Sequence, residues 1–170
     1  MASTASISRK AVGISVTDII AVLFIYLVPT ISHLTAAPLY LLDPMRIAVL
    51  GALMYTRNWK NSLALAATLP LFSFFIGAHP VFMKSLLIAM ELGLNVLLFV
   101  GIAKVVTNKG IAMFLSIIAS KMVYYAFKAM FISGGLIQMS LVSTEIWIQL
   151  VVATVLSDGI WFAYRKTTRA

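Results

Sequence analysis

The chain has 170 residues, of which 62% are hydrophobic and only 11% are charged, and its mean hydropathy is +1.03. Soluble domains carry about 25% charged residues, so this composition excludes an ordinary soluble protein and indicates an integral membrane protein without a separate soluble domain. Cysteine is absent, which excludes disulfides, thiolate metal sites and a cysteine nucleophile, and the net charge is +8.

Six apolar segments are candidates for membrane-crossing helices, each of which needs about 20 residues. The first follows the basic pair Arg9-Lys10 and is longer than the apolar core of a signal peptide, so we expect an uncleaved first helix. The second and third are short and are joined by the polar turn TRNWKN. We therefore predict an all-α fold that forms a single membrane domain over residues 1–170, built as a bundle of six transmembrane helices. The predicted helices cover residues 14–33, 40–56, 61–78, 83–106, 110–132 and 144–164.

The connections between these segments differ in charge. On one side they contain a single basic residue, Lys84, at the start of the fourth helix. Basic residues are retained on the cytoplasmic side of membranes, so we expect a multi-pass membrane protein with both termini in the cytoplasm. The same bias accounts for the net charge, and nucleic-acid binding is not expected. The basic residues of the inner side are Arg9, Lys10, Arg57, Lys60, Lys104, Lys109, Arg165, Lys166 and Arg169.

Two of the predicted helices carry polar residues along one face. An ionisable group at the bilayer centre costs about 2.5–3.5 kcal/mol, so it normally faces the bundle interior or water. From the rise of 1.5 Å per residue, the two stripes lie at matching depths below the outer surface. In segment 83–106 the stripe has i, i+7, i+11 spacing and consists of Lys84, Glu91 and Asn95. In segment 110–132 it has i, i+4, i+7 spacing and consists of Lys121, Tyr125 and Lys128.

Further polar residues are predicted in the same outer half. Arg46 lies near the outer end of the second helix, and His79 lies in the loop before the fourth. Glu145 and Gln149 share a face at the outer end of the sixth helix. A surplus of cations over acids in this region favours a binding site for an anionic solute, because packing alone does not require it. The cations are Arg46, Lys84, Lys121 and Lys128, and the acids are Glu91 and Glu145, with Asp43 closer to the rim.

Each of these residues also has a purely structural interpretation. Glu91 can neutralise Lys121 or Lys128 as a buried ion pair, and Arg46 can pair with Asp43. Lysines near helix ends can extend to the headgroups instead of facing a cavity. The convergence of four helices is what favours a site over these alternatives.

The sequence contains no pattern typical of catalysis. GxSxG, HExxH and P-loop motifs are absent, and no serine has an evident base beside it. The two histidines have no spacing typical of metal ligands. We therefore predict no catalytic residue, no metal site and no cofactor, and an intramembrane enzyme ranks last among the possible functions.

The overall plan resembles the substrate-binding S component of an energy-coupling factor (ECF) vitamin transporter. Residues 69–99, LPLFSFFIGAHPVFMKSLLIAMELGLNVLLF, are similar to the family's third-to-fourth helix region, where a proline-containing outer loop precedes a helix with a buried glutamate. The resemblance implies a prokaryotic plasma (inner) membrane protein that binds a vitamin or related nutrient from outside. It also implies a transmembrane coupling subunit and two cytoplasmic ATPase subunits as partners. The substrate contacts that it implies are Lys84, Glu91, Asn95, Lys121, Tyr125 and Lys128.

One feature departs from the family. Its members carry an alanine-rich motif of small residues in the first helix for docking to the coupling subunit, whereas here Ala48 and Ala52 place such a pair in the second. Small residues four apart let membrane helices approach closely, so this pair serves either docking or internal packing. The alternative function is a non-transporting membrane scaffold, similar to the cell-shape protein MreD, in which the buried charges are structural ion pairs.

Overall fold

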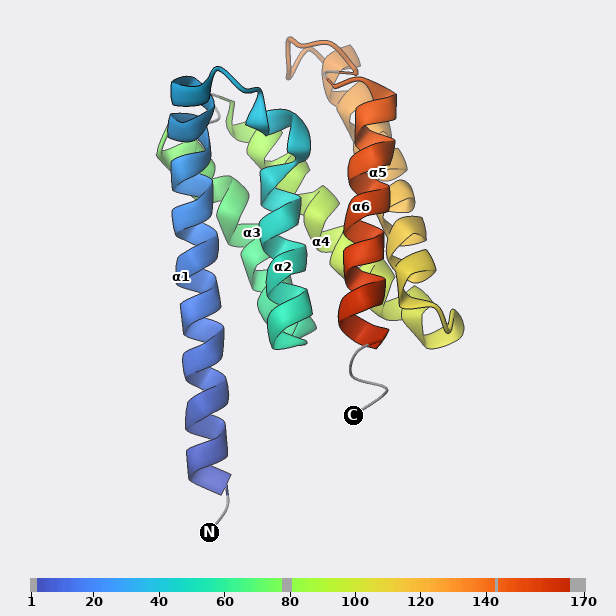
Figure 1. The fold of residues 1–170 in the computed structure, drawn as a ribbon. Coiled ribbons are helices and arrows are strands. Elements are labelled where there is room, and N and C mark those ends of the chain that lie inside the picture. The colour runs from blue at the N-terminus through green and yellow to red at the C-terminus, as the bar shows by residue number, and fades with distance from the viewer. Residues whose placement is uncertain (1–2, 78–80, 143, 166–170) are drawn as a thin grey trace.

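The computed structural model describes residues 3–77, 81–142 and 144–165, with side chains from residue 11 onward. This part of the chain is all-helical, as predicted (Figure 1). Its elements are α1 (Ser3–Thr35), the short 3₁₀ helix η1 (Leu39–Leu42), α2 (Pro44–Thr56), α3 (Trp59–Phe75), α4 (Phe82–Val105), α5 (Lys109–Ser133) and α6 (Ile146–Arg165).

Four of the helices are long and apolar enough to cross a membrane: residues 11–35 of α1, and all of α4, α5 and α6. The helices α2, with 13 residues, and α3, with 17, are shorter than the roughly 20 residues that a span needs. Membrane helices are therefore indicated for four of the six predicted segments, and six crossings remain a prediction.

The predicted second helix is divided at Asp43. This residue adopts the left-handed conformation, with φ 54° and ψ 59°, and Pro44 then occupies the first turn of α2. Proline is tolerated there because its missing N–H has no partner within the helix anyway. Residues that precede Asp43 form η1 instead of another turn of α2, and this places the Asp43 side chain beside the helix start.

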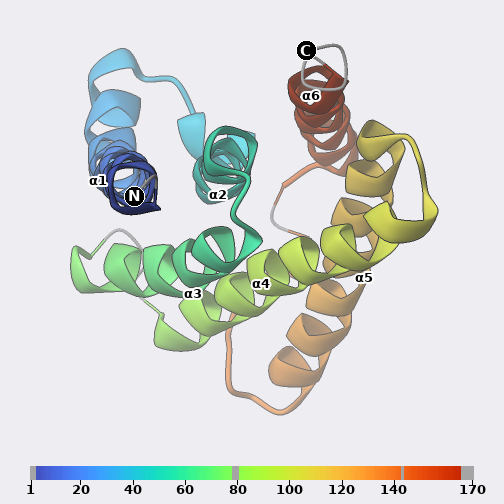
Figure 2. The same cartoon turned by 90° about the horizontal axis from the view of Figure 1, so that it is seen from below.

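The six helices form two layers of three. Figure 2 shows α1, α2 and α6 in one row and α3, α4 and α5 in the other, and helices that follow one another in the chain pack together within and between the rows. At one end of the bundle α1 begins and α6 ends, and we call it the terminus end. At the other, the far end, α1 and α5 end and α2, α4 and α6 begin (Figure 1).

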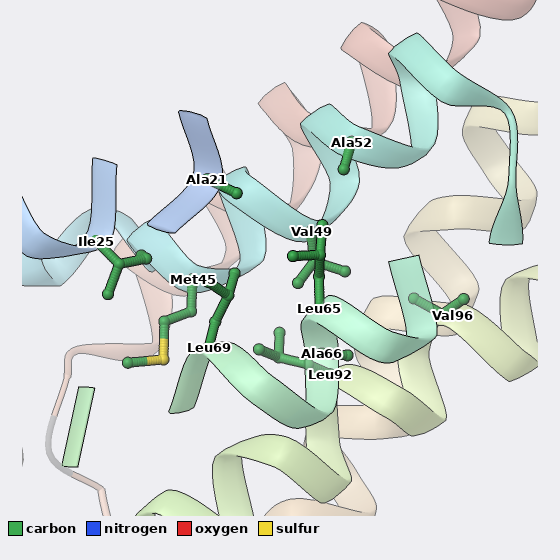
Figure 3. Close-up of a cluster of buried hydrophobic side chains, with 10 residues drawn as sticks. All are labelled: Ala21, Ile25, Met45, Val49, Ala52, Leu65, Ala66, Leu69, Leu92 and Val96. Atoms are coloured by element: carbon green, nitrogen blue, oxygen red, sulfur yellow. The ribbon is translucent and has the colours of Figure 1, made fainter. Parts of the chain in front are cut away.

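Two apolar clusters hold the layers together. The first joins α1, α2, α3 and α4 and includes Val49, Leu69 and Leu92 (Figure 3). The second joins α2, α4, α5 and α6 around Leu50 and Ile117. Large apolar side chains on the outside, such as those of α1, remain exposed to the surroundings, as lipid-facing residues of a membrane helix would be.

Candidate binding site

A cavity of about 280 Å³ opens between the layers at the far end of the bundle. Its lining comes from η1, from the beginnings of α2, α4 and α6, and from the second half of α5. The second apolar cluster forms its floor, because Ala153 belongs both to the cluster and to the lining. The cavity therefore has a closed apolar base and charged walls.

A network of four charged side chains crosses one wall. Arg46 is only 1% exposed, and its guanidinium donates a hydrogen bond from Nη2 to Glu91 Oε1, while its Nε lies 3.1 Å from Asp43 Oδ2. Lys121 Nζ lies 3.3 Å from Glu91 Oε1 and 3.7 Å from Asp43 Oδ2. Two cations and two carboxylates thus link the start of α2 to α4 and α5 through their side chains.

Two more lysines line the same cavity. Lys128 is 1% exposed, and its Nζ lies 5.7 Å from the centre of the Tyr124 ring, a geometry in which a cation is attracted to the ring face. Burial of Lys128 argues against extension to the headgroups. Lys84 is partly exposed, and no described carboxylate lies within 4 Å of its ammonium group. Among the described residues, the lining therefore holds four cations and two carboxylates, a formal charge of +2.

Arg46 also retains hydrogen-bonding capacity. Its Nη1 is buried and finds no acceptor among the described residues. Buried donors are nearly always paired, and an unpaired one costs about 1–3 kcal/mol.

A neutral polar pair completes the wall formed by α5 and α6. Gln149 donates from Nε2 to the Tyr125 hydroxyl at 2.7 Å and to the carbonyl of Thr144 at 2.7 Å. The Tyr124 and Tyr125 rings meet edge to face, with their centres 5.3 Å apart. These contacts hold aromatic side chains beside the charged network, so the cavity offers a ring surface as well as charge.

Seven of the ten predicted site residues line this cavity: Arg46, Lys84, Glu91, Lys121, Tyr125, Lys128 and Gln149. His79 lies outside the described residues. Asn95 is buried one turn below Glu91 and donates to Ser116 at 2.9 Å, at the level of the apolar cluster that forms the floor. Glu145 is exposed and accepts a hydrogen bond from the Trp147 indole, so it points away from the cavity.

The structure also adds lining residues that are not among the ten predicted site residues. Asp43 was placed nearer the rim, yet it contacts two of the site cations. Tyr40, Tyr124 and Thr144 complete the polar lining. Two features of the sequence point to Asp43: its i, i+3 spacing to Arg46, and its position directly before the proline that starts a helix.

The pair proposed for docking lies inside the bundle. Ala52 is 1% exposed within the first apolar cluster, and Ala48 packs against that cluster. This placement matches the packing alternative, in which small residues let α2 approach its neighbours. Across residues 3–77, 81–142 and 144–165, no three His, Cys, Asp or Glu side chains gather in a way that could hold a metal ion.

Comparison with known proteins finds no family model, no curated protein and no solved structure that matches this chain, so the cavity itself is the basis for assigning a function.

Proposed function

We propose that this chain is the solute-binding membrane subunit of a transporter that takes up a small anionic or zwitterionic nutrient of the vitamin type. The far end of the bundle faces the outside, and partner ATPase subunits supply the energy, as in the ECF S components that the sequence resembles. One observation carries the proposal: the cation-rich cavity at the far end, with the buried Arg46 and Lys128 in its lining.

The energetics of buried charge support a ligand. Each ionised side chain inside a membrane costs a few kcal/mol unless an opposite charge and hydrogen bonds compensate it. Asp43 and Glu91 compensate Arg46 and Lys121. An anionic solute would add negative charge to a described lining whose formal charge is +2.

The two carboxylates also have a positioning role in this proposal. They hold the Arg46 side chain of α2 and the Lys121 side chain of α5 at the same carboxylates, so little side-chain entropy would be lost when a solute carboxylate or phosphate binds. The amine of a zwitterionic solute would find its counter-charge in the same carboxylates. Tyr124 and Tyr125 would contact a ring.

The test is ligand-induced stabilisation of the purified protein in lipid nanodiscs against a panel of vitamins and their precursors. We expect at least one anionic or zwitterionic member to raise the unfolding temperature, and we expect Lys121→Ala and Glu91→Ala to abolish that increase. Lys104→Ala is the matched control, because Lys104 is an exposed lysine at the terminus end. If no member binds and the site variants leave nutrient uptake by cells unchanged, the proposal is wrong.

The second candidate function is the non-transporting scaffold. The observation in its favour is the ion network itself, since Glu91 is paired with both Arg46 and Lys121. A scaffold needs the ion pairs but needs no cavity beside them. The two candidates therefore differ in whether a soluble anion competes for these cations, which the same stabilisation assay measures.

A further inference from the structure

A second, larger cavity adjoins the charged one. It measures about 740 Å³ and lies between α1, the connection 36–38, η1 and the beginnings of α2 and α4, with Ser73 of α3 at its edge. Thirteen described residues line it, of which eight are apolar and none is acidic. It therefore differs from the charged cavity mainly in having a single described charged residue, Lys84, in place of six.

The two cavities share part of their walls. Tyr40, Pro44, Met45 and Lys84 line both of them, so the start of α2 and the first turn of α4 separate a charged compartment from an apolar one. Of the described residues that line both cavities, Lys84 alone is charged. Lys84 thus lies at the boundary of the two compartments.

The wall of the apolar cavity is held in place before any ligand binds. The Ser32 hydroxyl donates to the carbonyl of Ala37 at 2.5 Å and accepts from the amide of Leu39 at 3.4 Å. Ala36 adopts a left-handed conformation, with φ 52°, where the chain leaves α1. These contacts fix the connection between α1 and η1, and a pre-formed pocket loses less entropy when it is filled.

The sizes of the cavities indicate how they are used. Sites for small organic molecules measure about 300–1,000 Å³, are mostly apolar and contain a few polar groups that fix orientation. The charged cavity alone falls just below that range and is rich in charge, whereas the adjoining cavity adds a larger volume lined mainly by apolar residues. Together they match an organic anion better than an inorganic one.

We propose that the solute is an amphiphilic organic anion, with its carboxylate or other anionic group in the charged cavity and a ring system or short hydrocarbon body in the apolar cavity beside Lys84. This inference rests on the proposed function and narrows its substrate class. Neither compartment alone selects such a molecule, because the first recognises charge and the second recognises apolar surface.

The experiment uses four probes that separate the two properties: acetate, benzoate, 2-naphthoate and the uncharged 2-naphthamide. Binding to the full chain in lipid nanodiscs is measured by titration, and empty nanodiscs correct for partitioning into lipid. We expect 2-naphthoate to bind about tenfold or more tightly than acetate, because its rings bury apolar surface. Benzoate should fall between them, and 2-naphthamide should bind more weakly than 2-naphthoate.

Two sets of variants assign the two compartments. Val28→Trp and Ala37→Leu fill the apolar cavity from two separate elements, so either one serves if the other fails to fold. We expect them to reduce 2-naphthoate binding to the level of acetate and to leave acetate binding unchanged. Lys121→Met, whose side chain lines only the charged cavity, should weaken all three carboxylates together.

The outcomes separate this inference from the function on which it rests. If the three carboxylates bind equally and the filling variants have no effect, the amphiphilic class is wrong while anion binding stands. If 2-naphthamide binds as tightly as 2-naphthoate, the apolar cavity accepts apolar molecules without an anion, and the inference is overturned. If no carboxylate binds and Lys121→Met has no effect, the proposed function fails as well.

Discussion

Basic residues at the two ends of the bundle have different kinds of partner. At the far end, Arg46 and Lys121 lie inside the protein and face carboxylates. At the terminus end, Arg57 is exposed, donates to the carbonyl of Ala163 at 3.0 Å, and lies 5.1 Å from the centre of the Tyr164 ring. The far end therefore gathers cations and acids in one network, whereas cations at the terminus end contact helix ends and rings.

The terminus end follows a simple electrostatic rule. Lys109 Nζ donates to the carbonyl of Ala103 at 2.6 Å, in the last turn of α4, just as Arg57 contacts the last turn of α6. Carbonyls at the C-terminal end of a helix have no partner within the helix and carry a partial negative charge, so cations are stabilising there. These basic residues complete helix ends and are also those expected on the cytoplasmic side.

The contrast shows what burial adds to a count of charges. The partly exposed Lys109 has a carbonyl partner at a helix end, whereas the cations of the charged cavity share their lining with only two described carboxylates. The far end is where a change should alter binding and stability together, and the terminus end is where a change should act on packing alone.

Removal of the Arg46 side chain should produce the largest effect. In Arg46→Ala, Asp43 and Glu91 lose their buried partner, and breaking a buried pair on one side costs about 3–5 kcal/mol. Equilibrium unfolding in mixed micelles measures this loss, and Lys104→Ala should change the free energy of unfolding by less than about 0.5 kcal/mol. Equal stability of the two variants would show that burial does not distinguish the two ends.

A smaller effect is expected from Gly110→Ala at the terminus end. A Cβ atom at Gly110 would lie 2.8 Å from Trp161 Cβ and 3.1 Å from the carbonyl oxygen of Ser157, so α5 and α6 would have to separate. Overpacking of this kind costs about 1–3 kcal/mol. Gly101→Ala is the control, because no atom lies within 4 Å of its new Cβ. Solute binding should survive in both variants, and its loss in Gly110→Ala would show that the two ends are coupled.

The smallest effect on stability is expected from Asn95→Ala, a variant that tests whether the site extends below the cavity floor to Asn95. The variant removes the Asn95–Ser116 hydrogen bond, and such bonds between membrane helices contribute on average about 0.6 kcal/mol and at most about 1.7 kcal/mol. Because Asn95 lies below the cavity floor, solute affinity should not change. A loss of affinity as large as that of Lys121→Ala would place Asn95 in the site after all.

The helices could be predicted from the sequence, because long apolar runs specify where they lie. The start of α5 is set by Asn108, whose side chain accepts from the amides of Gly110 and Ile111, and it falls one residue before the predicted start at 110. The division of the second helix at Asp43 was missed, because hydropathy does not report a single left-handed residue.

The site could be predicted only in part. Spacing along one helix places Glu91 and Asn95 on the same face, but it does not reveal where the apolar floor closes the cavity between them. Pairing between helices is also invisible to spacing: Arg46 and Glu91 are 45 positions apart, and the choice of Arg46 as a partner depends on how α2 packs. The surplus of basic over acidic residues at the site, by contrast, could be predicted, because it depends on composition alone.

The conformation of Asp43 restricts how this position can vary. Among residues with a side chain, asparagine and aspartate are those that most readily adopt the left-handed conformation, and of these only aspartate carries the charge that faces Arg46 and Lys121. Glycine would keep the course of the chain without the charge, and glutamate would keep the charge at the cost of a strained backbone. We therefore expect few substitutions at position 43 during evolution, for two independent reasons: the backbone conformation and the charge. An aspartate at this position would identify distant relatives that preserve both the turn and the pocket.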